Sequence, residues 1–183
     1  MSRSLILILL TTLAAALAVV TPACVGLPIK LIWNGSASVP IGLYEIVSPE
    51  QIDVTDLVAV APPEPLAAWM AGRGYLARGV PLLKRVMGVP GQRICRIGNA
   101  VTVDAVPLGD ALDRDRRGRA LPVWQGCHRI LDGEIFLMNP AVRDSLDGRY
   151  FGPLPARDVI GKATPLLTDE AGNGRFIWRA ATR

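Results

Sequence analysis

The chain has 183 residues, half of them hydrophobic, with 20 Lys and Arg against 16 Asp and Glu and a formal net charge of +4. This length suits one domain with a sizeable core. The basic residues concentrate in the run DRDRRGR at 113–119, where aspartates rather than aromatic residues alternate with them. That pattern is typical of a solvated loop and not of a nucleic-acid surface. A nucleic-acid partner is therefore not expected.

The N-terminal segment carries much of the excess hydrophobicity. After Arg3 no charged residue occurs until Lys30, and the apolar run Leu5–Val20 is extended by Thr21–Val25. Together they reach the roughly 20 residues of a membrane-spanning helix. A cleaved signal peptide has the same parts, so both interpretations stay open, with an uncleaved anchor favoured. Arg3 predicts that the N-terminus lies inside and the remainder of the chain outside, and under either interpretation the body of the protein is exported.

Short apolar runs broken by Pro and Gly follow this segment, and they indicate β structure. One helix is predicted over Pro65–Leu76, and a projecting loop insertion over about 107–125. The expected fold is mostly β, with an N-terminal transmembrane anchor or signal sequence (1–28) and an exported domain (29–183). The predicted strands are Gly42–Val47, Asp56–Ala61, Pro81–Val89, Gln92–Ile97, Ala100–Val106, Gly133–Met138, Val159–Leu167 and Arg175–Ala180.

Two of the three cysteines, Cys95 and Cys127, are candidates for a disulfide, because Cys24 ends the apolar segment. In an oxidising compartment the bond would close a loop of about 30 residues and stabilise the fold by about 3 kcal/mol. Two buried thiols are the alternative. A single His and two scattered Cys lack the ligand spacing of a zinc site, so neither a metal nor a cofactor is expected.

Two polar residues, Lys84 and Ser38, are candidates for a role in catalysis. Lys84 in the predicted strand shares a face with Leu82 and Val86. Burial there would lower its pKa toward that of a general base, whereas a lysine that reaches the surface is the ordinary alternative. Ser38 is either a turn serine or a nucleophile. A Ser-His-Asp triad would have His128 as its one candidate base, expected to be structural, but a Ser-Lys pair needs no histidine.

Three motifs resemble the boxes of the signal peptidase clan, in the family's order and over essentially the whole chain. They are SASVPIGLY, similar to the nucleophile box of TraF-type conjugative transfer peptidases, LLKRVMGVPGQRI, similar to the lysine box of type I signal peptidases, and SLDGRYFGPLP, similar to the third box. Gln92 replaces a usual Asp, the GDN before the third box is absent, and Gly148 stands where type I enzymes often have Ser. The DGRYFGP form favours the TraF-type branch.

The resemblance implies catalytic roles for residues at matching positions. Ser38 would be the nucleophile and Lys84 the general base. The hydroxyl of Ser36 and the N–H of Ser38 would form an oxyanion hole. Ser145 would hydrogen-bond Lys84 and orient it.

Further residues are expected to support the site or bind substrate. The resemblance implies that Asp147 pairs with Arg149 and buttresses the site from behind. Pro40 would fix the backbone after the nucleophile. Leu82 and Val86, on the face of the lysine, are predicted to line a shallow pocket for small residues, with core packing as the alternative.

The implied function is a membrane-anchored serine endopeptidase that processes an exported precursor. For TraF-type relatives this means maturing, and cyclising, a conjugative pilin subunit. The expected partners are the precursor and the membrane. A general type I signal peptidase and a non-catalytic, membrane-anchored β-domain of a secretion or conjugation channel remain alternatives. A self-cleaving repressor is disfavoured by the membrane segment and the lack of a DNA-binding helical domain.

Overall fold

Two antiparallel sheets form the body of the protein in this computed structural model, which describes residues 3–24 and 28–181. The larger sheet has eight strands, one of which, β12 (Ile177–Trp178), pairs with β11 outside the main order. The main order is β1 (Leu31–Asn34), β2 (Ile41–Val47), β11 (Val159–Asp169), β3 (Leu57–Val60), β4 (Leu82–Gly88), β9 (Glu134–Met138) and β10 (Leu154–Pro155).

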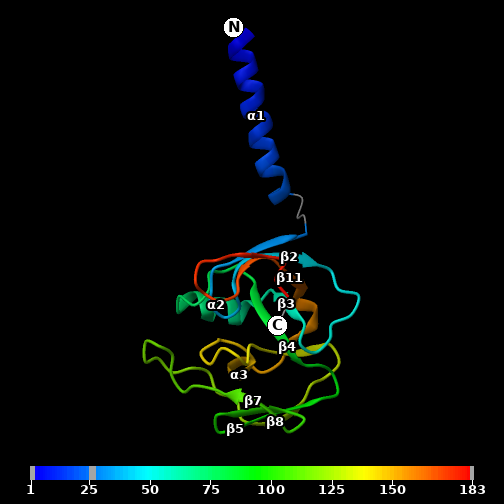
Figure 1. The fold of residues 1–183 in the computed structure, drawn as a ribbon, viewed down its shortest axis with the longest axis vertical. Helices are drawn as coiled ribbons and strands as arrows, with labels where there is room; N and C mark the ends of the chain where they lie inside the picture. Colours follow the sequence, from blue (N-terminus) through cyan, green and yellow to red (C-terminus); the bar gives the residue numbers. More distant parts are fainter. Residues whose placement is uncertain (1–2, 25–27, 182–183) are drawn as a thin grey trace.

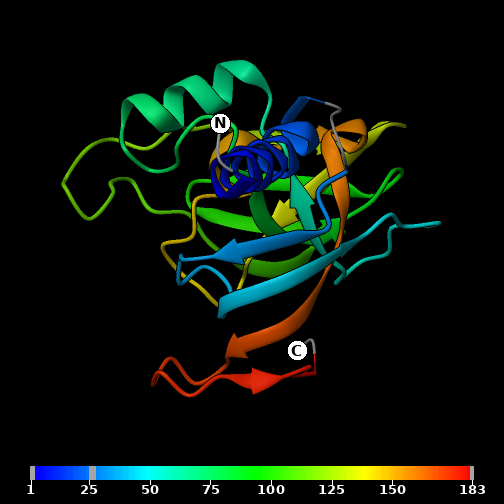
Figure 2. The ribbon, with the colours of Figure 1, turned by 90° about the horizontal axis from the view of Figure 1, so that it is seen from above.

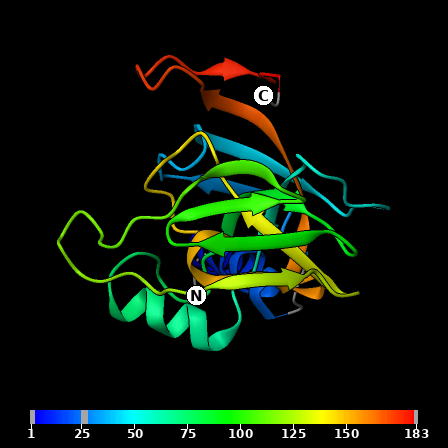
Figure 3. The ribbon, with the colours of Figure 1, turned by 90° about the horizontal axis from the view of Figure 1, so that it is seen from below.

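The second sheet lies at the end of the molecule opposite the N-terminal helix (Figures 1 and 3). Its order is β7 (Val106–Asp110), β6 (Ala100–Val103), β5 (Arg93–Ile97) and β8 (Gly126–Arg129). Ile97 pairs with Ala100, so a two-residue turn at Gly98-Asn99 joins β5 to β6. The predicted insertion at 107–125 begins inside β7, and only the part after it projects as a loop (Figure 3).

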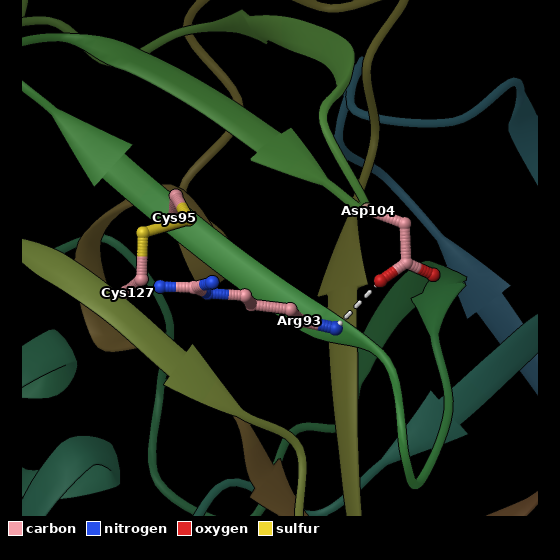
Figure 4. The surroundings of a disulfide bond; sticks show 4 residues. All are labelled: Arg93, Cys95, Asp104 and Cys127. Atoms are coloured by element: carbon pink, nitrogen blue, oxygen red, sulfur yellow. Dashed lines mark hydrogen bonds between the residues drawn. A yellow bond between two sulfur atoms is a disulfide. The ribbon is translucent and has the colours of Figure 1, made fainter.

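A disulfide joins Cys95 on β5 to Cys127 on β8, which lie directly opposite each other in the register. Figure 4 shows this bond beside Arg93, whose backbone N–H donates to Asp104 at 2.8 Å. All four residues of β8 are exposed, so little apolar burial holds this edge strand. The disulfide and the ladder to β5 therefore fix β8 in place.

Helices occupy little of the domain itself. The helices are α1 (Arg3–Cys24), α2 (Glu64–Gly72), α3 (Gly148–Phe151) and a 3₁₀ turn at Ala156–Asp158. From above, α2 lies on one side of the larger sheet and β12 at the opposite edge (Figure 2). α2 confirms the predicted helix, starting one residue earlier and ending at Gly72, four residues before the predicted end.

The N-terminal helix α1 extends away from the sheets, with Leu7 62% and Leu13 58% exposed (Figure 1). Within the described part of the chain, no helix combines the length and the apolar character that crossing a membrane requires. The transmembrane part of the expected fold is therefore not supported. The predicted N-terminal segment 1–28 also includes residues 1–2 and 25–27, which lie outside the described residues.

The mostly β fold agrees with the strand pattern, but several short elements were not predicted. Each of the eight predicted strands corresponds to an observed strand. The elements that were not predicted have no clear pattern in the sequence. For example, β8 has no buried residue, and β10 is a two-residue pairing with β9. The elements absent from the prediction are β1, β7, β8, β10, α3 and the 3₁₀ turn.

The core forms on both faces of β9. Ile135 and Leu137 pack with Val86 of β4 in one cluster, whereas Phe136 and Met138 pack against the second sheet. This alternation follows from the period of two along a strand. β9 therefore contributes side chains both to the core of the larger sheet and to the contact with the second sheet. The residues that follow β9 begin next to β4, its neighbour in the larger sheet.

Candidate active site

A buried asparagine shapes the loop that carries the two candidate serines. Asn34, at the end of β1, donates through Nδ2 to the carbonyl oxygens of Ser36, Val39 and Pro40 at 2.8 to 3.1 Å. Its Oδ1 accepts from the backbone N–H and the hydroxyl of Ser36. The loop is therefore wrapped around one amide. It holds Ser36 Oγ 3.1 Å from Ser38 Oγ.

Lys84 is buried in the middle of β4, with 3% of its surface exposed. Its Nζ donates to Ser145 Oγ at 2.9 Å. The pKa of Lys84 is lowered to about 8, because burial lowers it most and the charge of Arg149 lowers it too, against the charge of Asp147, which raises it. No carboxylate of the described residues lies within ion-pair distance of this amine. The alternative of a lysine that reaches the surface is therefore wrong.

The third motif folds into a loop that leads into α3 and is organised by a buried ion pair. Arg149 donates through Nε and Nη2 to the two carboxylate oxygens of Asp147, at 2.9 and 2.8 Å, and both residues are 1% exposed. The same guanidinium donates to the carbonyl oxygens of Val142, Arg143 and Ser145. Arg149 thus holds the loop that presents Ser145 to the lysine.

Asn139, which lies outside all three motifs, connects the serine loop to β4. Its Nδ2 donates to the carbonyl oxygens of Ser38 at 2.9 Å and Leu83 at 3.2 Å, and its Oδ1 accepts from Arg85 N at 3.0 Å. The available signals were weak: an Asn-Pro pair after a strand for Asn139 and an Asn-Gly turn for Asn34. Both indicate a turn but not its partners.

The structure brings the predicted site residues to one region without a direct bond between serine and lysine. Among the described residues, Ser38 Oγ has its hydrogen bond with Ser36, and Lys84 Nζ has its own with Ser145. Ser38 is half-buried, and Ser36 is exposed. The arrangement offers an amine that can hold a proton and two hydroxyls on an accessible loop.

A cavity of about 760 Å³ lies beside Ser38 and Pro40. From β4 it is lined by Arg85 and Met87, not by Leu82 and Val86. Val86 is fully buried among Ile135, Leu137 and their neighbours, which is the core-packing alternative, and Leu82 is buried too. The described residues contain no group of three His, Cys, Asp or Glu side chains able to hold a metal ion.

Comparison with known proteins shows which family the chain belongs to. The family model of signal peptidase, peptidase S26, matches residues 2–167. The chain belongs to this family. As an S26 family member it resembles "Probable conjugal transfer protein TraF" of Sinorhizobium fredii, with 36% identity over 172 residues, 85% of this chain and 89% of that one. "Conjugal transfer protein TraF" of Agrobacterium fabrum is 31% identical over 147 residues, 74% of this chain and 81% of that one.

The family resemblance stated from the three motifs is thus confirmed. Among solved structures, a signal peptidase I from Enterococcus faecalis is similar to this S26 family member with 17% sequence identity and a TM-score of 0.39. The match covers 63% of this chain and 98% of that structure.

Gly148 of this S26 family member is the position where type I enzymes often have Ser, and the structure leaves no room for a side chain there. A Cβ atom would lie 2.6 Å from both Leu137 O and Phe136 Cε2. We expect Gly148→Ala to lower the free energy of unfolding by about 2 kcal/mol or more, because the strand backbone cannot yield. Urea unfolding measures the change.

Gly72→Ala is the matched control for this prediction. Gly72 ends α2, and a Cβ atom there would meet nothing within 4 Å. Its effect should stay within about 0.5 kcal/mol. Equal stability of the two variants would show that the strand backbone does not restrict position 148.

Proposed function

We propose that this S26 family member is an exported serine endopeptidase in which Ser38 is the nucleophile and Lys84 the general base. The observation that carries the proposal is the buried amine of Lys84, whose pKa is lowered to about 8 and whose hydrogen bond goes to Ser145. An amine in this state exchanges a proton near neutral pH, which an ordinary lysine does not. The family relationship supports the same assignment.

In the proposed reaction, neutral Lys84 takes the proton of Ser38 Oγ as this oxygen attacks the scissile carbonyl carbon. The developing oxyanion accepts hydrogen bonds from the Ser36 hydroxyl and the Ser38 backbone N–H. Protonated Lys84 then gives its proton to the leaving amine, and an acyl-enzyme remains on Ser38. Catalytic hydrogen bonds often form only with substrate bound, which is consistent with Lys84 and Ser38 each bonding another serine here.

The proposed substrate is a precursor of a conjugative pilin subunit. The support is that the relatives from Sinorhizobium fredii and Agrobacterium fabrum are named as conjugal transfer proteins. The precursor would lie in extended form along the cavity beside Ser38, which Pro40 and Met87 line. Water would resolve the acyl-enzyme to a linear product, and the amino end of the same subunit would resolve it to a cyclic one.

The localisation belongs to the proposal as well. We place the chain at the inner membrane with a cytoplasmic N-terminus and the β-domain in the periplasm. An oxidising compartment suits the Cys95–Cys127 disulfide, which cytosolic proteins rarely keep. The exposed apolar side chains of α1 suit contact with lipid or with the export machinery.

The test is acylation by a penem, since β-lactams acylate the serine of other Ser-Lys enzymes. The adduct should form on Ser38, located by mass spectrometry, and should be absent from Ser38→Ala and Lys84→Ala. The rate should rise with pH through about 8, because about a tenth of the amine is neutral at pH 7 and about nine tenths at pH 9.

Two results would contradict the proposal. One is acylation of Ser38 that persists in Lys84→Ala at the rate of the parent protein. The other is a rate that rises only above pH 10, since a rise in that range would indicate a lysine with its ordinary pKa.

A further inference from the structure

The end of β9 places a hydrogen-bonding side chain between the two halves of the proposed dyad. We infer that Asn139 is a positioning residue that fixes the Ser38 loop relative to the β4 backbone on both sides of Lys84. This inference rests on the proposed function, because it assigns a role within the same site. It adds a residue that neither the motifs nor the family relationship singles out.

The contacts of Asn139 show how the connection is made. Its side-chain amide donates to the carbonyl oxygens of Ser38 and Leu83, at 2.9 and 3.2 Å, and accepts from Arg85 N at 3.0 Å. Leu83 and Arg85 are the neighbours of Lys84 on either side. One planar amide therefore joins the carbonyl of the nucleophile to the strand segment that carries the base.

The sheet topology explains why a side chain is needed here. β9 pairs with β4 up to Met138, which lies opposite Arg85. The next but one residue, Pro140, has no N–H to donate, so the ladder cannot continue along β4. Beyond Met138 the backbone of β9 no longer pairs with β4, and the side-chain amide of Asn139 forms the hydrogen bonds to β4 instead.

The residue type matters because only a primary amide supplies these three bonds. Two N–H groups and a carbonyl oxygen are required in one plane. A carboxylate of the same size would keep the acceptor for Arg85 N but lose both donors. It would also add a negative charge beside the β4 segment that carries Lys84, which favours the protonated form of the amine.

Asn139 is also tied to the third motif through its backbone. Its N–H donates to Asp147 Oδ2 at 3.1 Å, and its carbonyl accepts from Arg149 Nη2 at 3.4 Å. Asn139 is 4% exposed, so water does not replace these partners easily. The loop that presents Ser145 and the loop that presents Ser38 therefore meet at this one residue.

The experiment compares Asn139→Ala and Asn139→Asp with the parent protein, using the rate of penem acylation at Ser38 between pH 6 and pH 10. We expect Asn139→Ala to acylate about 100-fold more slowly, because a displaced nucleophile loses its alignment, with the rate still rising through about pH 8. Asn139→Asp should be slowed similarly, and its rate should rise only at higher pH. Gln125→Ala is the matched control, since its amide bridges the backbone N–H and carbonyl of Gly98 in the second sheet.

Urea unfolding separates positioning from folding. Rates are compared under conditions in which each variant is more than about 99% folded. Acylation of folded Asn139→Ala and Asn139→Asp at the parent rate, whatever their loss of stability, overturns the inference and leaves the proposed function intact. Lack of Ser38 acylation in the parent protein itself overturns both. If Asn139→Ala does not fold, the isosteric Asn139→Asp, which keeps the acceptor and both backbone bonds, decides the question by its rate and pH profile.

Discussion

Ser38→Ala, Lys84→Ala and the double substitution are expected to slow precursor cleavage by about the same factor, on the order of 10⁴-fold or more. The reason is that a nucleophile without its base, or a base without its nucleophile, contributes almost nothing to the cleavage rate. The double variant should therefore be no worse than the more damaging single variant. Cleavage of a purified pilin-like precursor, followed by mass spectrometry, measures the three rates.

Lys162→Ala serves as the lysine control for this cycle. Lys162 lies on β11, where its Nζ pairs with Asp56 at 2.7 Å, and its side chain is 32% exposed. It should retain the parent rate within about twofold, because a surface pair contributes little. If the rate loss of the Ser38/Lys84 double variant equals the product of the two single losses, the two residues act independently, and the dyad would have to be abandoned.

Arg149→Met is expected to lower the free energy of unfolding by about 3 to 5 kcal/mol. The substitution leaves the carboxylate of Asp147, itself fully buried, without the cation that neutralises it. It also leaves the carbonyl oxygens of Val142 and Arg143 without this donor. Urea unfolding at neutral pH gives the change in stability.

The control for Arg149 is an ion pair at the surface. Arg78 and Glu64 lie 2.9 Å apart with side chains 65% and 71% exposed, so Arg78→Met should change stability by less than about 1 kcal/mol. A similarly small effect for Arg149→Met would mean that burial does not make this pair important. The view of Asp147 and Arg149 as the support of the Ser145 loop would then be wrong.

The Ser38 and Lys84 positions illustrate how far local patterns lead. The order and spacing of the three motifs singled out both residues as candidates, and Lys84 lies in β4, the strand expected to carry it. Alternation does not say what covers each face, however. Leu82 and Val86 do not line the cavity beside Ser38, because Val86 packs with Ile135 and Leu137 of the neighbouring strand β9, whereas Arg85 and Met87 line that cavity.

Asn139 shows the opposite case, in which no local pattern suffices. Its partners Ser38, Leu83 and Arg85 lie 101, 56 and 54 residues away along the chain. An Asn-Pro pair predicts a turn, but the turn acquires a role only when β9 pairs with β4. The exposed strand β8 is similar, since its formation depends on pairing with β5 and on the disulfide.

The sequence by itself determined the family and the mostly β character, and it singled out Ser38 and Lys84 as the candidate dyad, because these depend on residue types at short spacing. Only the tertiary structure decided that Lys84 is buried and does not reach the surface, which face of β4 lines the cavity, and that Asn139 joins the serine loop to the lysine strand. The physical reason is that burial and hydrogen-bond partners depend on segments far apart in the chain. Those segments meet only when the strands are assembled into sheets.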